Sequence, residues 1–342
     1  MSDYSSNATV PEIAARIRSA ERIALLTHRR PDGDGMGSVL ALQRGLTALG
    51  KEAEIYLMGS IEEALLVVAG ATQYRRVEHD PPGDDHDLVI VTDTGAYGQL
   101  EPLVDWLRAH QANVVGIDHH TQGEEVAAMR LVDPAAASAT MMLVPLFDEL
   151  GIELTGGPGG IAEPLFVGLA TDTGWFRFSN AGAEAFAVAA RLLGCGVDKT
   201  RLYQLIEETY RPPRLGLEAR ALASLEYARS GSVAIMTLRR ADFEATGGSH
   251  DLLTGIVNRP MVVGTVRISI LLVELEASKT KVSLRGKPPR DGEPAEETDV
   301  NRLAALIGGG GHVFAAGATL RIGIDAARRR VRELVEHDRV MG

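Results

Sequence analysis

Short apolar runs alternate with segments of helical spacing along the first half of the chain. The runs have the composition of buried strands and lie at residues 22–27, 52–57, 87–92 and 113–117. The segments between and after them are typical of helices and lie at residues 38–49, 100–110, 138–150 and 162–170. Strands of this length separated by helices predict βαβ units and a mostly parallel sheet. We therefore expect an α/β fold in which helices flank that sheet.

The pattern changes in the second half of the chain. Residues 183–193 and 198–210 have the spacing of successive helices, and Pro212 and Pro213 predict a break in helical structure. Strand-like runs then occupy residues 233–238, 266–275 and 281–284, the last two as a pair. A loop rich in Pro, Gly and Glu at 287–298 precedes a short helix at 301–307.

These changes divide the chain into parts. Its 342 residues exceed the usual domain length of about 100–200 residues. We expect one domain at 1–185, a helical connector at 186–228 and a smaller α/β domain at 229–342, with a cleft between the two domains.

The charge and cysteine content exclude several classes of protein. With 46 acidic and 35 basic residues the formal net charge is −11, which disfavours binding to long duplex nucleic acid. A single cysteine, Cys195, excludes a disulfide framework and a zinc site built from several thiolates. Residues 1–7 lack a signal pattern, and apolar stretches such as 268–273 fall short of the ~20 residues of a membrane helix. We expect a soluble, cytoplasmic protein without membrane contact.

Acidic residues and histidines follow several of the predicted elements. Three lie in a glycine-rich turn after the first strand, one ends the strand 88–92, three follow the strand 114–117, and one follows the apolar segment 164–170. In order, they are His28, Asp32 and Asp34; Asp93; Asp118, His119 and His120; and Asp172. Taken singly, the aspartates are also typical of turns and helix caps. A dinucleotide-binding loop is disfavoured, because Ser38 stands where its third glycine is required.

The combination indicates metal binding. The carboxyl ends of parallel strands meet at one edge of a sheet, so these side chains would gather there. Crowded carboxylates repel one another strongly at low dielectric unless cations lie among them. Oxygen ligands with some imidazole suit Mn²⁺ or Mg²⁺. Two such ions about 3.5–4 Å apart are a common device for in-line attack on phosphorus.

A second signal is the glycine run that follows the helix at 301–307. It consists of Gly308, Gly309, Gly310 and Gly311 and is followed by His312. Successive glycine N–H groups can point into one concavity and bind phosphate oxygens, to which His312 would add a donor. A flexible linker is the alternative, but the apolar residues on both sides favour a structured element.

The motifs HRRPDGD, VTDTG, DHH, ATDTG and GGGGH, in this order, resemble those of the DHH phosphoesterase superfamily with its C-terminal DHHA1 domain. Nearly the whole chain resembles the short, two-domain branch of nanoRNases and 3′-phosphoadenosine 5′-phosphate (pAp) phosphatases. It departs from that pattern at Gly35, where Ala is usual, at Thr121, where Pro is common, and at Ala181, where Thr is frequent. These departures bear on substrate preference, since each ligand-type residue is present.

The resemblance implies a DHH catalytic domain, a DHHA1 substrate-binding domain and two divalent cations, with Mn²⁺ favoured over Mg²⁺ or Co²⁺. One ion would be held by His28, Asp32 and Asp93, and the other by Asp34, Asp93, His119 and Asp172. Asp118 would orient neighbouring groups, and His120 would contact the scissile phosphate. The glycine run, His312 and Arg285 would hold the far phosphate of the substrate.

The resemblance also implies an activity. We expect hydrolysis of short single-stranded oligonucleotides to mononucleotides, and of pAp to AMP and phosphate. The fold of the family also implies a homodimer. A phosphodiesterase for linear or cyclic dinucleotides is the main alternative, and a nucleotide-binding sensor without activity is another. A RecJ-like exonuclease is disfavoured by the acidic charge, and a pyrophosphatase by the GGGGH segment.

Overall fold

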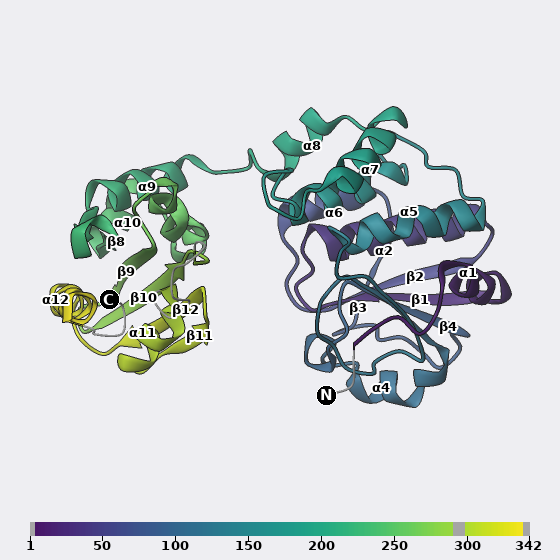
Figure 1. Ribbon diagram of the computed structural model, residues 1–342, viewed down its shortest axis with the longest axis horizontal. Coiled ribbons are helices and arrows are strands. Elements are labelled where there is room, and N and C mark those ends of the chain that lie inside the picture. Colours follow the sequence, from purple (N-terminus) through teal and green to yellow (C-terminus); the bar gives the residue numbers. More distant parts are fainter. Residues whose placement is uncertain (1–3, 290–297, 338–342) are drawn as a thin grey trace. The chain divides into compact units, whose positions relative to one another are not determined.

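The computed structural model describes residues 4–289 and 298–337 (Figure 1). They form two compact units, of which the first ends at Thr209 and the second begins at Tyr210. The predicted connector, 186–228, is divided between these units. The roles assigned to the two predicted domains stay predictions.

A six-stranded parallel sheet forms the centre of the first unit, as the sequence predicts. Its strand order is β3-β2-β1-β4-β5-β6. The strands are β1 (Arg22–Thr27), β2 (Glu52–Leu57), β3 (Arg75–Arg76), β4 (Leu88–Thr92), β5 (Val114–Asp118) and β6 (Met129–Val132). The sequence pattern missed β3 and β6, because β3 has only two residues and β6 is only partly buried at the sheet edge. The mixed α/β architecture is confirmed.

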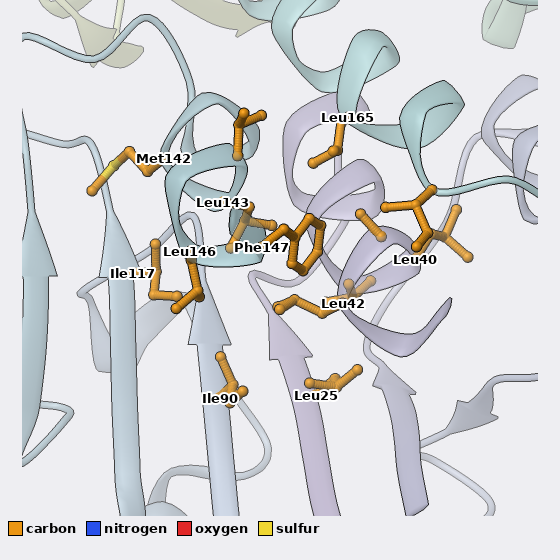
Figure 2. Close-up of a cluster of buried hydrophobic side chains, with 14 of the residues drawn as sticks. Leu25, Leu40, Leu42, Ile90, Ile117, Met142, Leu143, Leu146, Phe147 and Leu165 are labelled. Carbon is orange, nitrogen blue, oxygen red and sulfur yellow. The ribbon is translucent and has the colours of Figure 1, made fainter. Parts of the chain in front are cut away.

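Helices cover both faces of this sheet (Figure 1). They are α1 (Val10–Ser19), α2 (Gly33–Ala48), α3 (Glu63–Ala69), α4 (Val104–Ala109), α5 (Ala139–Leu150), α6 (Ala162–Asp172), α7 (Ala183–Gly194) and α8 (Lys199–Ile206). The strands send alternate residues to opposite faces, so that Leu25 packs with α2, α5 and α6, and Leu26 packs on the side of α4. In Figure 2, Leu25 and Ile90 of the strands lie below Phe147 of α5, and Ile117 lies to its left. This core holds the strand ends in fixed positions.

The helix α2 begins earlier than the sequence predicts. We expected a glycine-rich turn up to residue 37, but the helix starts at Gly33. Asp32 is its N-cap, and its side chain accepts hydrogen bonds from the N–H groups of Asp34 and Gly35. This capping outweighs the poor helix propensity of the glycines. Asp34 therefore lies on the first helical turn rather than in a loop.

A second six-stranded sheet, of mixed direction, forms the centre of the second unit. Its order is β11-β12-β10-β9-β8-β7. The strands are β7 (Glu226–Ala228), β8 (Val233–Leu238), β9 (Ile268–Glu276), β10 (Lys279–Gly286), β11 (Gly310–His312) and β12 (Ala315–Leu320). The predicted pairing of the segments around 266–275 and 281–284 is present as β9 and β10.

The helices of the second unit pack on this sheet. They are α9 (Pro212–Ala223), α10 (Arg240–Thr246), α11 (Val300–Leu306) and α12 (Ile324–His337). Pro212 and Pro213 begin α9 instead of only breaking a helix, because the missing N–H of proline is not needed in a first helical turn. The predicted loop at 287–298 lies mostly outside the described residues. None of the helices in the described ranges is long and apolar enough to span a bilayer.

Candidate metal centre

The strand order brings the predicted site residues together. His28, Asp93 and Asp118 stand at the carboxyl ends of β1, β4 and β5, which are adjacent in the sheet. Thr27 of β1 pairs with Thr92 of β4, and Thr92 pairs with Ile117 of β5. The order reverses between β1 and β4, and ligands of parallel α/β sheets bind at such a point. The candidate site therefore lies at the position in the sheet where this topology favours ligand binding.

Asp93 joins two histidines. Its Oδ2 atom is 3.3 Å from Nε2 of His28, and its Oδ1 atom is 3.3 Å from Nε2 of His119. Asp93 is almost fully buried and has a φ of 61°, in the left-handed region that non-glycine residues seldom adopt. Such strain is typical of functional sites, where the surrounding structure enforces it. Asp32 completes the first group, with Oδ1 at 3.6 Å from Nε2 of His28.

His119 is the centre of the second group. Its Nε2 atom lies 3.3 Å from Oδ2 of Asp172 and 3.8 Å from Oδ2 of Asp34. Asp172 is the last residue of α6, and Asp34 is in the first turn of α2. The structure thus gathers carboxylates from two helices and from the end of β4 around one imidazole, which itself follows β5.

Asp34 is held by contacts that sequence reasoning missed. Its fully buried carboxylate accepts hydrogen bonds from the N–H of Ala139 at 2.6 Å and from the N–H of Thr140 at 2.9 Å. The hydroxyl of Thr140 donates a third bond at 2.6 Å. The carboxylate therefore sits on the N-terminus of α5, whose partial positive charge stabilises it. The only local signal was the Ser138-x-Thr140 pattern at the start of a predicted helix.

Glycines allow α2 and α6 to approach closely enough to build the site. A Cβ on Gly168 of α6 would lie 2.6 Å from Oδ1 of Asp34, and one on Gly37 of α2 would overlap the carbonyl oxygen of Pro164. Gly35, where the resembling family usually has Ala, faces His28: its Cβ would lie 3.0 Å from Nε2. Gly37 and Gly168 are thus required by the close approach of α2 and α6 beside Asp34.

Asp118 and His120 form a separate pair beside these groups. Oδ1 of the fully buried Asp118 is 2.7 Å from Nδ1 of His120, whose side chain is 54% exposed. The other oxygen, Oδ2, accepts a hydrogen bond from the hydroxyl of Tyr4 at 2.7 Å. Nδ1 of His120 is 3.9 Å from Oδ1 of Asp93, so the pair adjoins the first two groups. The sequence predicts the positions of Asp118 and His120 but not the contact with Tyr4.

The pKa values show how strongly the charges interact. Burial opposes protonation of His28, but hydrogen bonds to Asp32 and Asp93 raise its pKa to about 10. Burial likewise opposes protonation of His119, but the hydrogen bond to Asp93 and the nearby carboxylates raise its pKa to about 9. Burial and repulsion by Asp93 and Asp32 raise the pKa of Asp172 to about 7. Burial and repulsion by Asp93 and Asp172 also raise the pKa of Asp34 well above its usual range.

This donor set fits divalent cations. Three groups offer ligand atoms within 4.8 Å of one another, and they are His28, Asp32 and Asp93; Asp34, His119 and Asp172; and Asp93, His119 and His120. Among the described residues, these carboxylates form ion pairs with histidines and with no Lys or Arg. A bound cation would replace protons on these histidines and carboxyls. Carboxylate oxygens with imidazole are ligands of Mn²⁺, Mg²⁺ and related ions.

The candidate phosphate-binding residues lie in the second unit. Ala315 of β12 pairs with Arg285 of β10 on one side and with His312 of β11 on the other. Directly paired residues point to the same face of a sheet, so Arg285 and His312 share a face, about 10 Å apart across two strand spacings. Their side chains differ in exposure: Arg285 is half-buried, whereas His312 is exposed.

The glycine run is more ordered than a loop. Gly308 and Gly309 donate their N–H groups to Ala305 and Ala304, and Gly310 and Gly311 belong to β11. A Cβ on Gly311 would lie 2.5 Å from the carbonyl oxygen of Ala315, so this glycine lets β11 approach β12. The flexible-linker alternative is thus not what the structure shows. Phosphate binding by these residues stays a prediction.

Comparisons with known proteins give the family. Residues 22–168 match the model of the DHH family, N-terminal domain. The chain is 34% identical over 319 residues to the bifunctional oligoribonuclease and PAP phosphatase NrnA of Thermus thermophilus, with 92% of this chain and 90% of the relative covered. It is 26% identical over 312 residues to the protein of that name in Bacillus subtilis, with 90% and 92% covered.

A solved structure shares the fold along the whole chain. An exopolyphosphatase-related protein from Bacteroides fragilis superposes with a TM-score of 0.80, covers 98% of each chain and is 23% identical in sequence. The motif resemblance, the family match and the extended similarity to the Thermus thermophilus protein agree with one another. The chain belongs to the DHH family.

Proposed function

We propose that this protein is a metal-dependent phosphoesterase that hydrolyses short single-stranded oligonucleotides to mononucleotides and pAp to AMP and phosphate. The observation that carries the proposal is the position of Asp93, whose two carboxylate oxygens face the His28 group and the His119 group separately. Such an arrangement suits two cations that share one carboxylate. The names of the Thermus thermophilus and Bacillus subtilis relatives support the substrate classes.

The metal ligands follow from the two groups. His28, Asp32 and Asp93 would hold one ion, and Asp34, Asp93, His119 and Asp172 the other, with Mn²⁺ favoured. When bound, these cations would act as Lewis acids that neutralise charge on the phosphoryl oxygens and activate water for in-line attack. The contacts of Asp34 with α5 and of Asp32 with the N-terminus of α2 hold these carboxylates in place before any cation binds.

His120 would donate a proton to the leaving group. Hydrolysis forms a bond between phosphorus and the water oxygen and breaks the bond to the leaving oxygen, which then needs a proton. The hydrogen bond from Nδ1 to Asp118 raises the pKa of His120 and leaves Nε2 as the free donor of a half-exposed ring. Asp118 would therefore keep His120 protonated and oriented.

Arg285 and His312 would bind a second phosphate of the substrate. Both lie on one face of the second sheet. Within residues 4–289 and 298–337, the guanidinium of Arg285 donates one hydrogen bond, to the carbonyl of Leu284, and its other N–H groups could bind a phosphate. Arginine recognises phosphate by paired N–H donors. The proposal thus requires a substrate with a phosphate beyond the scissile one, as in pAp and short oligonucleotides.

The test is an assay of the purified full chain with Mn²⁺. The substrates are a ladder of 5′-labelled single-stranded oligonucleotides from two residues upward, a long duplex, pAp and cyclic di-AMP. We expect mononucleotides from the shortest substrates and inorganic phosphate from pAp, with little product from the duplex. Binding of Mn²⁺ is confirmed separately by calorimetry. Absence of both products from metal-loaded protein would reject the proposal, and turnover of cyclic di-AMP alone would favour the dinucleotide phosphodiesterase.

A further inference from the structure

We infer that Tyr4 is a positioning residue of this site, which fixes the carboxylate of Asp118 and, through it, the imidazole of His120. The inference rests on the proposed function, in which His120 contacts the substrate. Tyr4 lies 114 residues away from Asp118 in the sequence, and its hydroxyl donates to Oδ2 of Asp118 at 2.7 Å. The motifs described above do not include it.

The two oxygens of Asp118 have separate partners. Oδ1 faces Nδ1 of His120 at 2.7 Å and also accepts from the N–H of His120 at 3.3 Å. Oδ2 faces Tyr4. A carboxylate held at both oxygens cannot rotate without breaking one bond, so the Tyr4 hydroxyl fixes the plane that orients the imidazole. Asp118 is fully buried, and loss of the Tyr4 bond would leave Oδ2 without that donor.

The backbone next to Tyr4 is anchored to the edge of the parallel sheet. Ser6 donates its hydroxyl to the carbonyl of Val132 at 2.9 Å and accepts from the N–H of Val132 at 2.7 Å. The N–H groups of Asn7 and Ala8 donate to the carbonyl of Arg130, at 3.0 and 3.1 Å. Residues 6–8 therefore cover the edge strand β6, which pairs with β5. Their position places Tyr4 near the end of β5.

Two glycines form a slot for the Tyr4 ring. A Cβ on Gly95, in the VTDTG motif, or on Gly123, just after the DHH motif, would overlap the ring. The two loops are joined by a hydrogen bond from the N–H of Glu124 to the carbonyl of Gly95. The phenol is thus inserted between the loops that follow β4 and β5. The absence of a side chain at Gly95 and at Gly123 makes room for the Tyr4 ring beside the site.

The experiment compares Tyr4→Phe with a matched control, Tyr97→Phe, in the full chain. Tyr97 lies in the same region, and its hydroxyl donates to the carbonyl of Glu125 at 3.3 Å rather than to a site residue. We expect Tyr4→Phe to lower kcat on pAp about 10-fold with little change in KM. Loss of a group that hydrogen-bonds to a residue of a metal site typically has an effect of about this size. Tyr97→Phe should retain the activity of the parent protein. Equal kcat values for Tyr4→Phe and the parent protein would overturn the inference.

A double variant tests the route through Asp118. If Tyr4 acts only by holding Asp118, then adding Tyr4→Phe to Asp118→Asn should cause little further loss of kcat. Independent, multiplicative losses from the two changes would contradict that route, and so the inference.

A spectroscopic readout separates this inference from the proposed function. In ¹⁵N-histidine-labelled, metal-free protein, the His120 ring signals are assigned by their disappearance in His120→Asn. We expect Tyr4→Phe, but not Tyr97→Phe, to shift the Nδ1 signal of His120, whatever substrate the protein uses. Unchanged His120 signals in folded Tyr4→Phe would overturn the inference, whereas a shifted signal in a protein without phosphoesterase activity would reject only the proposed function.

Discussion

The Oδ1 atom of Asp93 lies 3.3 Å from the Nε2 atom of His119. The opposite oxygen of the same carboxylate lies at the same distance from His28, so one buried side chain serves both ligand groups. Asp93 belongs to one candidate metal-binding group with His28 and to another with His119.

Replacement of Asp93 by Asn should therefore affect both groups at once. We expect kcat to fall by more than ~100-fold, because changes in the outer shell of metal sites already cost about 10–100-fold. Binding of Mn²⁺, measured by calorimetry, should weaken in parallel. Asp105→Asn, on the exposed side of α4, removes one carboxylate elsewhere and should change neither quantity. Near-normal Mn²⁺ affinity in Asp93→Asn would contradict the assignment.

The metal-free protein should lose stability as the pH rises. The pKa of His28 is about 10 and that of His119 about 9 in the folded chain, against 6.5 when unperturbed. A raised pKa contributes stability below the unperturbed value and loses it as pH rises through the folded one. Asp172, raised from 3.8 to about 7, acts in the same direction at lower pH.

The measurement is thermal unfolding between pH 6.5 and about 9. In EDTA, Tm should decrease across this range. In Mn²⁺ or Mg²⁺ the decrease should be smaller, because the cation binds the deprotonated ligands and stabilises the folded state. A Tm that responds to pH equally with and without the cation would argue against metal binding by these residues.

Thr140 should affect the site through Asp34. Thr140→Val keeps the shape of the side chain and removes the hydroxyl that donates to Oδ1 of Asp34 at 2.6 Å. We expect Mn²⁺ affinity to fall about 10-fold, as for other outer-shell partners. Thr173→Val, which removes a buried hydroxyl bonded to the carbonyl of Leu169, should lower stability but leave Mn²⁺ affinity unchanged. Equal Mn²⁺ affinities for the two variants would show that the hydroxyl of Thr140 does not affect metal binding.

Gly168 should resist a substitution that usually stabilises helices. Glycine within a helix costs about 0.5–1 kcal/mol relative to alanine. At Gly168, however, the added Cβ would lie 2.6 Å from Oδ1 of Asp34 and would overlap Thr140, so we expect Gly168→Ala to lower the free energy of unfolding by about 1–3 kcal/mol. Gly194→Ala at the end of α7 meets open space and should be neutral or stabilising. Urea titrations of both variants would show whether the signs differ.

Arg285 should act on substrate binding rather than on metal binding. Arg285→Ala removes the guanidinium that shares a sheet face with His312. We expect KM for pAp to rise by about 10-fold or more, since a charged hydrogen bond contributes roughly 1.5–3 kcal/mol. Mn²⁺ affinity should not change. Arg321→Ala serves as the control, because this exposed residue follows β12 outside the predicted phosphate-binding group. An unaltered KM in Arg285→Ala would exclude the residue from the substrate site.

The alternation of strands and helices, together with the placement of acids and histidines after apolar runs, was sufficient to predict the parallel sheet and the ligand-type residues at its edge. That prediction succeeds because parallel strands share one carboxyl edge: His28, Asp93 and His119 need only follow their strands to become neighbours. The order of the motifs also indicated the family.

Other features depended on contacts that no local pattern encodes. Tyr4 reaches Asp118, and Thr140 reaches Asp34, across more than a hundred residues, because the N-terminal segment lies on the sheet edge and α5 begins beside α2. The start of α2 at Gly33 and the pairing of Gly310–His312 as a strand were likewise decided by capping and by close backbone approach. Periodicity along a chain reports which residues are buried, whereas only the packed fold determines which buried groups become partners.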